Sequence, residues 1–306
     1  MTTSVAAAAE SARAIAWRRR RAGIARTWHE FATQKAALAG LFLLVLTVLL
    51  ALLLPVISDQ SGLDVTRVTG KPLSPPDSQF WLGTDIDGRS VLLMTVWGTR
   101  ISLLVGFCAT ALSVFIGTLI GITAAHFGGW VSAILLRFTD FFLVLPSLVL
   151  AIALSAVLPQ GIWTIVLAIG VTAWPSTARL VRAQTLTIES RPYIERSRAL
   201  GGGHLHVIGK HVLPGVAPLV LANTTLVVGN AVIADATLSF LGVGDPNSIS
   251  WGAMLETALN NGAVTRGAWW NLLPPGIAIV CVVLMFTLVG RGLETVLNPR
   301  LKGRHS

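Results

Sequence analysis

Charged residues are scarce in this sequence, and their scarcity excludes most soluble folds. Lys, Arg, Asp and Glu make up 12% of the 306 residues, whereas 53% of the residues are hydrophobic. An ordinary soluble domain carries about twice that share of charge. Several apolar runs of about 18 residues or more instead predict an all-α polytopic membrane protein.

Cysteine is nearly missing too, which argues against a disulfide framework and against a cysteine-based metal site. Cys108 and Cys281 both fall inside apolar runs and are expected to be packing residues. His204, His206 and His211 lie close together, but no carboxylate or cysteine stands at a useful spacing from them. We therefore expect a polar interface there and no metal site.

Sequences that bind nucleotides or calcium are also missing. No G-x-x-x-x-G-K-[ST] stretch and no nucleophile–base arrangement occurs, so we expect neither an enzyme nor a cofactor-binding chain. Asp85–Gly88 matches only part of a calcium loop. The net charge of +9 does not indicate nucleic-acid binding, because Arg18–Arg21 lie just before the first apolar run, where basic residues set membrane orientation.

The apolar runs predict six transmembrane helices, at about 36–57, 99–125, 130–158, 162–180, 212–240 and 272–296. Pro146 is expected to kink the third span, and Gly106, Gly117 and Gly121 are expected to allow close packing of the second. The remaining segments are expected to be a basic tail (1–35), two loops (58–97 and 243–271), a core (98–296) containing a polar hairpin (183–211), and a short tail (297–306).

The positions of Lys and Arg orient these spans. On the side of the two loops lie five of the 23 basic residues, Arg67, Lys71, Arg89, Arg100 and Arg266. The other 18 lie on the side of both tails and the hairpin. Basic residues are enriched in cytoplasmic segments, so the tails and the hairpin are predicted to be cytoplasmic and the loops extracytoplasmic.

The polar hairpin is predicted to form a compact knob. Ser190 is expected to cap a short helix at 191–200, with Pro192 in its first turn and Gly201 as the left-handed residue that ends it. Glycines 201–203 then turn the chain into a second short segment ending before Pro214. Such a knob can enter a groove of another protein. The side chains it is expected to offer are Tyr193, Ile194, Leu200, Glu195, Arg196 and Arg198.

Four sequences in order carry a family resemblance. They are LGTDIDGRS at 82–90, the hairpin with Glu195, Gly201, Leu213 and Pro214, TLSFLGVG at 237–244, and WGAML at 251–255. Together they resemble the C-type subunit of the dipeptide/oligopeptide/nickel permease family of bacterial ABC importers. The hairpin resembles the EAA loop of that family. The resemblance implies six transmembrane helices in the type I ABC importer permease (MetI-like) fold. Positions 196 and 197 depart from the two alanines of the EAA loop.

The resemblance also implies partners and a location. Such a subunit forms a heterodimer with a second, B-type permease in the bacterial cytoplasmic (inner) membrane, with both termini cytoplasmic. Two ABC ATPase subunits or domains use ATP and Mg, and an extracytoplasmic binding protein delivers the substrate. The substrate is expected to be a peptide, with nickel or another small solute as the alternative. The residues expected to couple to the ATPases are Tyr193, Ile194, Glu195, Arg196, Arg198, Ala199, Leu200, Gly201, Leu213 and Pro214.

Asp235 is the most informative residue inside the membrane, because an acid is costly in lipid and is expected to face other helices or an aqueous path. Two interpretations stay open: it lines or gates a translocation path, or it anchors helices by hydrogen bonds. A proton-driven secondary transporter working through Asp235 is the less favoured alternative, and a non-transporting scaffold is another. Arg137 and Asp140 are expected to pair on one helical face. The expected path residues are Asn223, Thr224, Asn230, Asp235 and Pro146.

The two external loops are expected to receive the binding protein. The contacts assigned to it are Asp85, Arg89 and Trp251. For the tryptophans of these loops the alternative is anchoring at the membrane interface.

Overall fold

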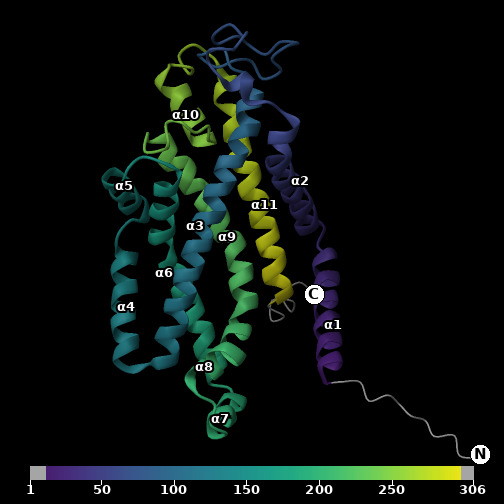
Figure 1. Ribbon diagram of the computed structural model, residues 1–306, viewed down its shortest axis with the longest axis vertical. Helices are drawn as coiled ribbons and strands as arrows, with labels where there is room; N and C mark the ends of the chain where they lie inside the picture. The colour runs from purple at the N-terminus through teal and green to yellow at the C-terminus, as the bar shows by residue number, and fades with distance from the viewer. Residues whose placement is uncertain (1–11, 298–306) are drawn as a thin grey trace, which may run out of the picture.

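The structure is a bundle of long helices. The computed structural model describes residues 12–297, where the chain is helical apart from loops and one isolated β-bridge, Thr84 to Ser90 (Figure 1). Most of the expected short tail at 297–306 and the first part of the basic tail lie outside the described residues. The helices are α1 (Ala12–Ala32), α2 (Lys35–Ile57), α3 (Val91–Phe127), α4 (Gly129–Val144), α5 (Ser147–Val157), α6 (Ile162–Glu189), α7 (Pro192–Ala199), α8 (His204–Val207), α9 (Leu213–Phe240), α10 (Trp251–Asn260) and α11 (Leu273–Leu297).

The spans agree with the expected six-helix membrane topology. Among the described residues five helices are long and apolar enough to cross a membrane, and α4 with α5 forms a bent pair that would make a sixth. The predicted kink at Pro146 is close to a right angle, 89°. Proline has no N–H to continue the helix, and it forces the preceding Leu145 into an extended conformation (ψ 131°).

Helix α3 is the centre of the bundle. It packs against α6 and α9, while α9 packs against α11 and α11 against α2 (Figure 1). Gly117 and Gly121 let α3 approach α6 closely, as their sequence predicted. A Cβ built on Gly121 would lie 2.6 Å from the carbonyl oxygen of Ala178, and one on Gly117 would lie 2.8 Å from that of Trp174. Only glycine fits at such a separation of backbones.

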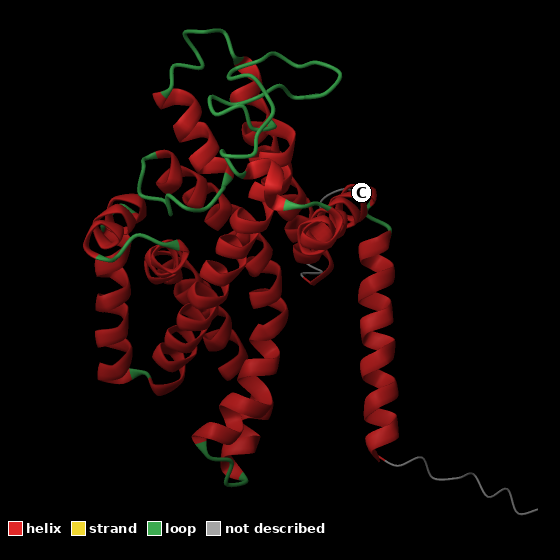
Figure 2. Cartoon of the chain, turned by 45° about the horizontal axis from the view of Figure 1, so that its top comes forward, coloured by secondary structure: helices red, strands yellow, loops and turns green. Residues whose placement is uncertain are grey.

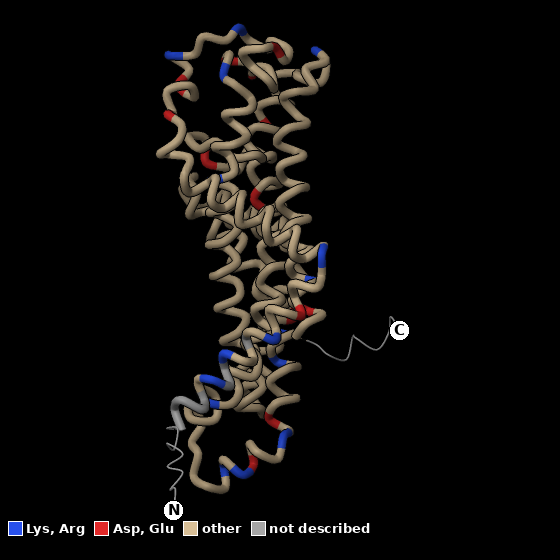
Figure 3. Tube along the Cα trace, turned by 90° about the vertical axis from the view of Figure 1, so that its right-hand side faces the viewer, with Lys and Arg blue, Asp and Glu red and all other residues tan. Residues whose placement is uncertain are grey.

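The two ends of the bundle differ. At one end lie the long segments 58–90 and 241–272, here called the loop end; Figure 2 shows how much of it is irregular chain. At the opposite end lie residues 190–212 with α7 and α8, here called the hairpin end. Lys and Arg gather toward the hairpin end and along α1, as Figure 3 shows.

Several boundaries differ from the predicted ones. Helix α3 begins at Val91, not 99, because the Ser90 hydroxyl accepts a hydrogen bond from the Leu93 N–H and caps it (3.4 Å). Helix α6 continues past 180 to Glu189. Ser190 closes α6 and does not cap α7: its N–H donates to the carbonyl of Leu186 (3.1 Å), and Arg191 occupies the cap position of α7.

The second half of the hairpin does not end before Pro214. Helix α8 runs through a π-helical turn, Ile208–Val212, into α9, and the whole stretch from His204 to Phe240 is one helical rod. The wide π turn comes just before Pro214, whose ring would clash with a carbonyl of a regular preceding turn. This local widening is what lets the helix pass through the proline.

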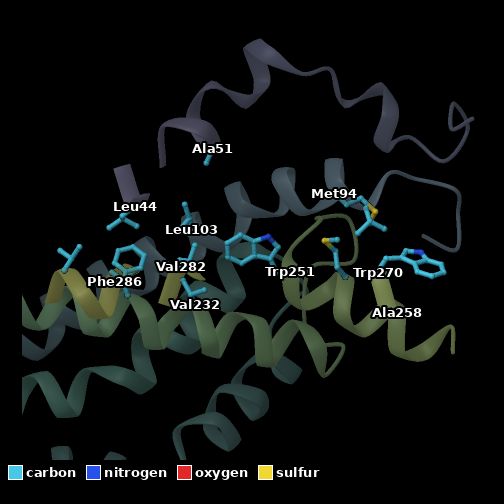
Figure 4. Close-up of a cluster of buried hydrophobic side chains, with 14 of the residues drawn as sticks. Leu44, Ala51, Met94, Leu103, Val232, Trp251, Ala258, Trp270, Val282 and Phe286 are labelled. Carbon is cyan, nitrogen blue, oxygen red and sulfur yellow. The ribbon is translucent and has the colours of Figure 1, made fainter. Parts of the chain in front are cut away.

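The largest apolar core ties the loop end to the helices. Figure 4 shows Trp251 of α10 lying amid Leu103, Val232 and Met94, and Trp251 is 1% exposed. The Trp251 indole N–H donates to the carbonyl of Thr95 (2.8 Å), and its backbone N–H donates to the hydroxyl of Ser102 (3.4 Å). The segment 241–272 at the loop end is thereby fixed to the first turns of α3.

Candidate functional site at the hairpin end

Helix α7 is a short, sharply ended helix. Pro192 stands in its first turn, as predicted. Gly201 has φ +85°, which confirms the predicted left-handed residue. The N–H of Gly202 donates to the carbonyl of Ser197 (2.9 Å) and that of Gly201 to the carbonyl of Arg198 (3.0 Å). This pair of bonds is a Schellman motif, which satisfies the last carbonyls of the helix and reverses the chain toward α8.

An exposed surface of mixed character results, here called the hairpin surface: Tyr193, Glu195, Arg196, Leu200 and Leu205. Leu200 is 82% exposed and Leu205 is 87% exposed, among the most exposed apolar side chains of the described chain. They stand beside charged residues, at the end of the bundle and away from the apolar faces of the spans. Large apolar side chains in such a place indicate contact with another protein.

Ile194 does not belong to that surface, although the sequence placed it there. It is fully buried and packs in a cluster with Ile122 of α3, Ile188 of α6 and Val216 of α9, among others. The correction has a simple cause: in a helix only two turns long, one face must rest on the bundle. Ile194 is therefore the buried apolar side chain that packs α7 against the spans.

A chain of polar contacts lies beside this cluster. The Arg198 guanidinium contacts Glu189 Oε2 (2.8 Å), Glu189 Oε1 contacts His126 Nδ1 (2.5 Å), and His126 Nε2 contacts His204 Nδ1 (2.8 Å). We call these four residues the polar chain. The His126 side chain is 1% exposed and that of Glu189 is 12% exposed. The polar chain joins α7, α6, α3 and α8.

His204 is connected to the Glu189 carboxylate through His126, although the sequence offered no carboxylate at a useful spacing from His204. Its partners lie far away in the sequence, with 78 positions separating it from His126. Within residues 12–297 no three His, Cys, Asp or Glu side chains form a metal-binding group.

Two of the expected path residues, Asn230 and Pro146, are exposed near α5. Asn230 is exposed and lines a cavity of about 140 Å³ between α3, α5, α6 and α9. Thr110 and Ser113 line the same cavity, and their hydroxyls have no hydrogen-bond partner in the described chain. Pro146 is exposed at the α4–α5 break. A narrow groove therefore opens beside α5, lined by hydroxyl and amide groups among apolar side chains, and we call it the polar groove.

Other expected path residues are engaged in helix packing. The Asn223 amide donates to the hydroxyl of Thr177 on α6 (3.2 Å), and the Thr224 hydroxyl donates to the carbonyl of Val220 one turn earlier (2.7 Å). The Arg137–Asp140 pair is not formed; Asp140 instead pairs with Arg179 of α6 (2.6 Å). Since α4 lies against α6, an arginine of the neighbouring helix replaces one of its own.

Asp235 is buried between helices and does not open on the groove. It is 1% exposed, and neither carboxylate oxygen makes a hydrogen bond of normal geometry. The hydroxyls of Ser102 and Ser239 lie beside it without reaching that geometry. The burial of Asp235 argues against direct lining of a path, and the missing hydrogen bonds leave the helix-anchor interpretation a prediction.

At the loop end, two side chains assigned to the binding protein face inward. Trp251 is 1% exposed and Asp85 is 6% exposed. Asp85 Oδ1 accepts from the backbone N–H of Arg89 (2.7 Å), and Asp85 Oδ2 accepts from the Arg89 Nε–H (2.8 Å). These residues shape the loops and offer no free surface. Exposed Trp81 and Trp269, at 74% and 52%, remain available for external contact.

We expect Asp85→Ala to loosen the loop end. Removing the Asp85 carboxylate costs roughly 1–3 kcal/mol, because the backbone N–H and the Nε–H of Arg89 lose their acceptor, and the Arg89 guanidinium keeps only Asp87 as its ion-pair partner. Limited proteolysis of the purified protein should cut within residues 58–90 at least about tenfold faster. Asp64→Ala is the control, since Asp64 is solvent-exposed and its contacts, with Thr66 and with the exposed Arg67, are local to its own turn. Equal cleavage of both variants would contradict the assignment.

A charged cavity of about 640 Å³ also opens at the loop end. Hydrogen bonds from the side chain of Ser61 lower the pKa of Asp59, and bonds from Thr66 lower the pKa of Asp64. Both carboxylates therefore stay ionised at neutral pH. Arg67 and Arg100 line the same cavity, so it carries both signs of charge.

A bundle of long apolar helices with an exposed helical knob at one end defines the class: a polytopic helical membrane protein. Comparison with known proteins identifies the family. The model of the binding-protein-dependent transport system inner membrane component matches residues 117–303, and that of the N-terminal transmembrane domain of oligopeptide transport permease C matches residues 24–76. The chain belongs to this family of ABC importer permeases, as its resemblance predicted.

Similar proteins cover nearly the whole chain. A putative peptide permease of Brucella suis is 36% identical over 278 residues, 90% of this chain and 91% of the relative. The oligopeptide transport system permease protein of Bacillus subtilis is 34% identical, over 89% of this chain and 88% of the relative. The glutathione transport system permease protein of Pectobacterium atrosepticum is 34% identical, over 90% of each.

Three residues of the site escaped the sequence prediction. Leu205 stands in the polar hairpin, and an isolated leucine there was the available signal. His126 and Glu189 end two different spans, where titratable residues usually meet water. Nothing in the sequence indicates that they meet each other across 63 positions.

Proposed function

We propose that this chain is one of two membrane subunits of an ATP-driven importer for peptides. The observation that carries the coupling assignment is the exposure of Leu200 and Leu205 on a helical knob, which calls for a protein partner. The partner that fits is an ABC ATPase, which would use ATP and Mg. The printed names of the relatives, which concern peptides, oligopeptides and glutathione, favour peptides over nickel as the substrate.

The orientation follows from the charge distribution. With the hairpin end in the cytoplasm, both termini are cytoplasmic, and the loop end faces outward with five of the 23 basic residues. The ATPases then dock from inside the cell on the hairpin surface, which includes Glu195 and Arg196. An extracytoplasmic binding protein docks on the loop end, and a second, B-type permease completes the pathway across the polar groove at Asn230.

Reconstitution tests this proposal. The chain would be purified with its second permease and ATPases and inserted into lipid vesicles, and its binding protein would be loaded from a tryptic digest of casein. Peptides accumulating inside would be identified by mass spectrometry. The proposal expects accumulation that requires ATP and the binding protein. Failure of the ATPases to co-purify, or uptake without ATP, would reject it; accumulation of nickel alone would reject the peptide assignment.

We expect Asp235→Asn to leave ATP-driven uptake within about twofold of the unchanged protein. The amide keeps the shape of the side chain, stays beside Ser102 and Ser239, and removes no hydrogen bond of normal geometry. Uptake would be measured in the same vesicles with and without a protonophore. Asp245→Asn, at the loop end, serves as control. Loss of uptake in the Asp235 variant, or its collapse with the protonophore, would favour the proton-driven alternative.

A further inference from the structure

We propose that His126 is a positioning residue that joins the hairpin surface to α3, so that movement of a docked partner is transmitted to the loop end. This inference rests on the proposed function, because it assumes that an ATPase docks on the hairpin surface. The inference assigns the transmission of this movement to helix α3 and to the side chain of His126.

The contacts define a continuous path. Arg198 belongs to α7 and borders the hairpin surface, with its side chain 47% exposed. Its partner Glu189 is the last residue of α6 and uses its second carboxylate oxygen for His126, the penultimate residue of α3. On the far side of the imidazole, His204 is the first residue of α8. One buried ring therefore connects both halves of the hairpin to α3.

Both ring nitrogens of His126 can take part in a hydrogen bond whether the imidazole is neutral or protonated. With a neutral His126, Nδ1–H donates to Glu189 and Nε2 accepts from the Nδ1–H of His204. With a protonated His126, both nitrogens donate and His204 accepts. Both arrangements are compatible with the 2.5 Å contact to the carboxylate and the 2.8 Å contact to His204. The connection is thus a fixed linkage with a defined direction in space.

Helix α3 can carry a displacement to the other end of the bundle. Its 37 residues are one unbroken helix, which at 1.5 Å per residue spans about 55 Å. Near its other end, the carbonyl of Thr95 and the hydroxyl of Ser102 hold Trp251. A shift of the polar chain along α3 therefore reaches the external segment 241–272, where the binding protein is proposed to dock.

Apolar packing alone does not supply this linkage. Ile194 anchors α7 against Ile122 of α3 and side chains of other helices at once, and these apolar contacts have no preferred direction. The polar chain instead fixes α7 and α8 to α3 by directional bonds. Loss of the His126 nitrogens should therefore spare docking and folding but weaken the coupling between the two ends.

The test compares three replacements in the complete complex in lipid vesicles. His126→Phe keeps a ring of similar size without nitrogens. His126→Asn keeps a donor near the Nδ1 position, toward Glu189, and His126→Gln keeps a polar group near the Nε2 position, toward His204. His29→Phe makes the same ring substitution at an exposed histidine of α1. The readouts are the amount of ATPase that co-purifies, ATP hydrolysis without binding protein, and its stimulation by binding protein loaded from a tryptic digest of casein.

We expect His126→Phe to retain the ATPases and unstimulated hydrolysis and to lose stimulation and uptake by at least tenfold. His126→Asn should recover part of the stimulation, because it restores the bond to Glu189, and His29→Phe should behave as the unchanged protein. Stimulation within twofold of normal in an assembled His126→Phe complex would overturn the inference. So would loss of ATPase binding, since His126 would then serve docking alone. Should His126→Phe fail to accumulate, unchanged stimulation in both His126→Asn and His126→Gln would overturn it. If the ATPases do not co-purify even with the unchanged chain, the proposed function fails instead.

Discussion

Leu205→Asp is expected to detach the ATPase subunits from this chain and to abolish ATP-driven uptake. Leu205 is 87% exposed in the isolated chain and belongs, like Leu200, to the hairpin surface. Burying a leucine against a partner contributes about 1.5–3 kcal/mol, and about 1.4 kcal/mol corresponds to a tenfold change in affinity. Its loss therefore lowers affinity roughly 10- to 100-fold, and the cost of desolvating an unpaired carboxylate lowers it further.

The effect would be measured as the amount of ATPase that co-purifies with the membrane subunits, together with uptake in vesicles. Leu259→Asp is the matched control, because Leu259 is 49% exposed on α10 at the loop end. The control should keep its ATPase. Because Leu205 contributes no packing inside the chain, the variant should still accumulate in the membrane in normal amounts. Normal ATPase binding by Leu205→Asp would place the docking site elsewhere.

The start and end of α7 in the hairpin were predictable from the sequence, and the burial of its side chains was not. Pro192 and Gly201 have backbone preferences that are local, so the start and end of α7 follow from the sequence. The burial of Ile194 depends on which face of a two-turn helix meets the bundle, and eight residues hold too little periodicity to decide it. Ser190 suits the end of one helix as well as the start of the next, and only the packing chooses.

Long-range polar contacts were the least predictable part. Asp140 has Arg137 one turn away, yet pairs with Arg179 of a neighbouring helix. Asp85 resembles a surface residue in sequence, yet its carboxylate closes its own turn with Arg89. The partner of Asp140 depends on tertiary distance, and the burial of the local Asp85–Arg89 pair depends on how the surrounding loop folds. Apolar run length, in contrast, is a local property, and for that reason the spans themselves were predicted well.

The close contact of α3 with α6 gives a second prediction with a large effect: Gly121→Ala should destabilise the bundle. The new methyl group would meet the carbonyl oxygen of Ala178 at 2.6 Å and the backbone nitrogen of Arg182 at 3.1 Å. Backbone atoms cannot rotate aside as a side-chain end can, so the two helices must separate. Overpacking of this kind costs roughly 1–3 kcal/mol.

Gly229→Ala on α9 is the matched control, because a Cβ there would meet its nearest atoms at an ordinary 3.8 Å. Alanine is the better helix former by about 1 kcal/mol, so the control should be neutral or slightly stabilising. Thermal unfolding of both purified variants, followed by tryptophan fluorescence, separates the two effects. A melting temperature for Gly121→Ala at or above that of the unchanged protein would mean that α3 and α6 do not touch as described. Helix α3 would then lack the rigid contact with α6 that a rod linking His126 to the loop end requires.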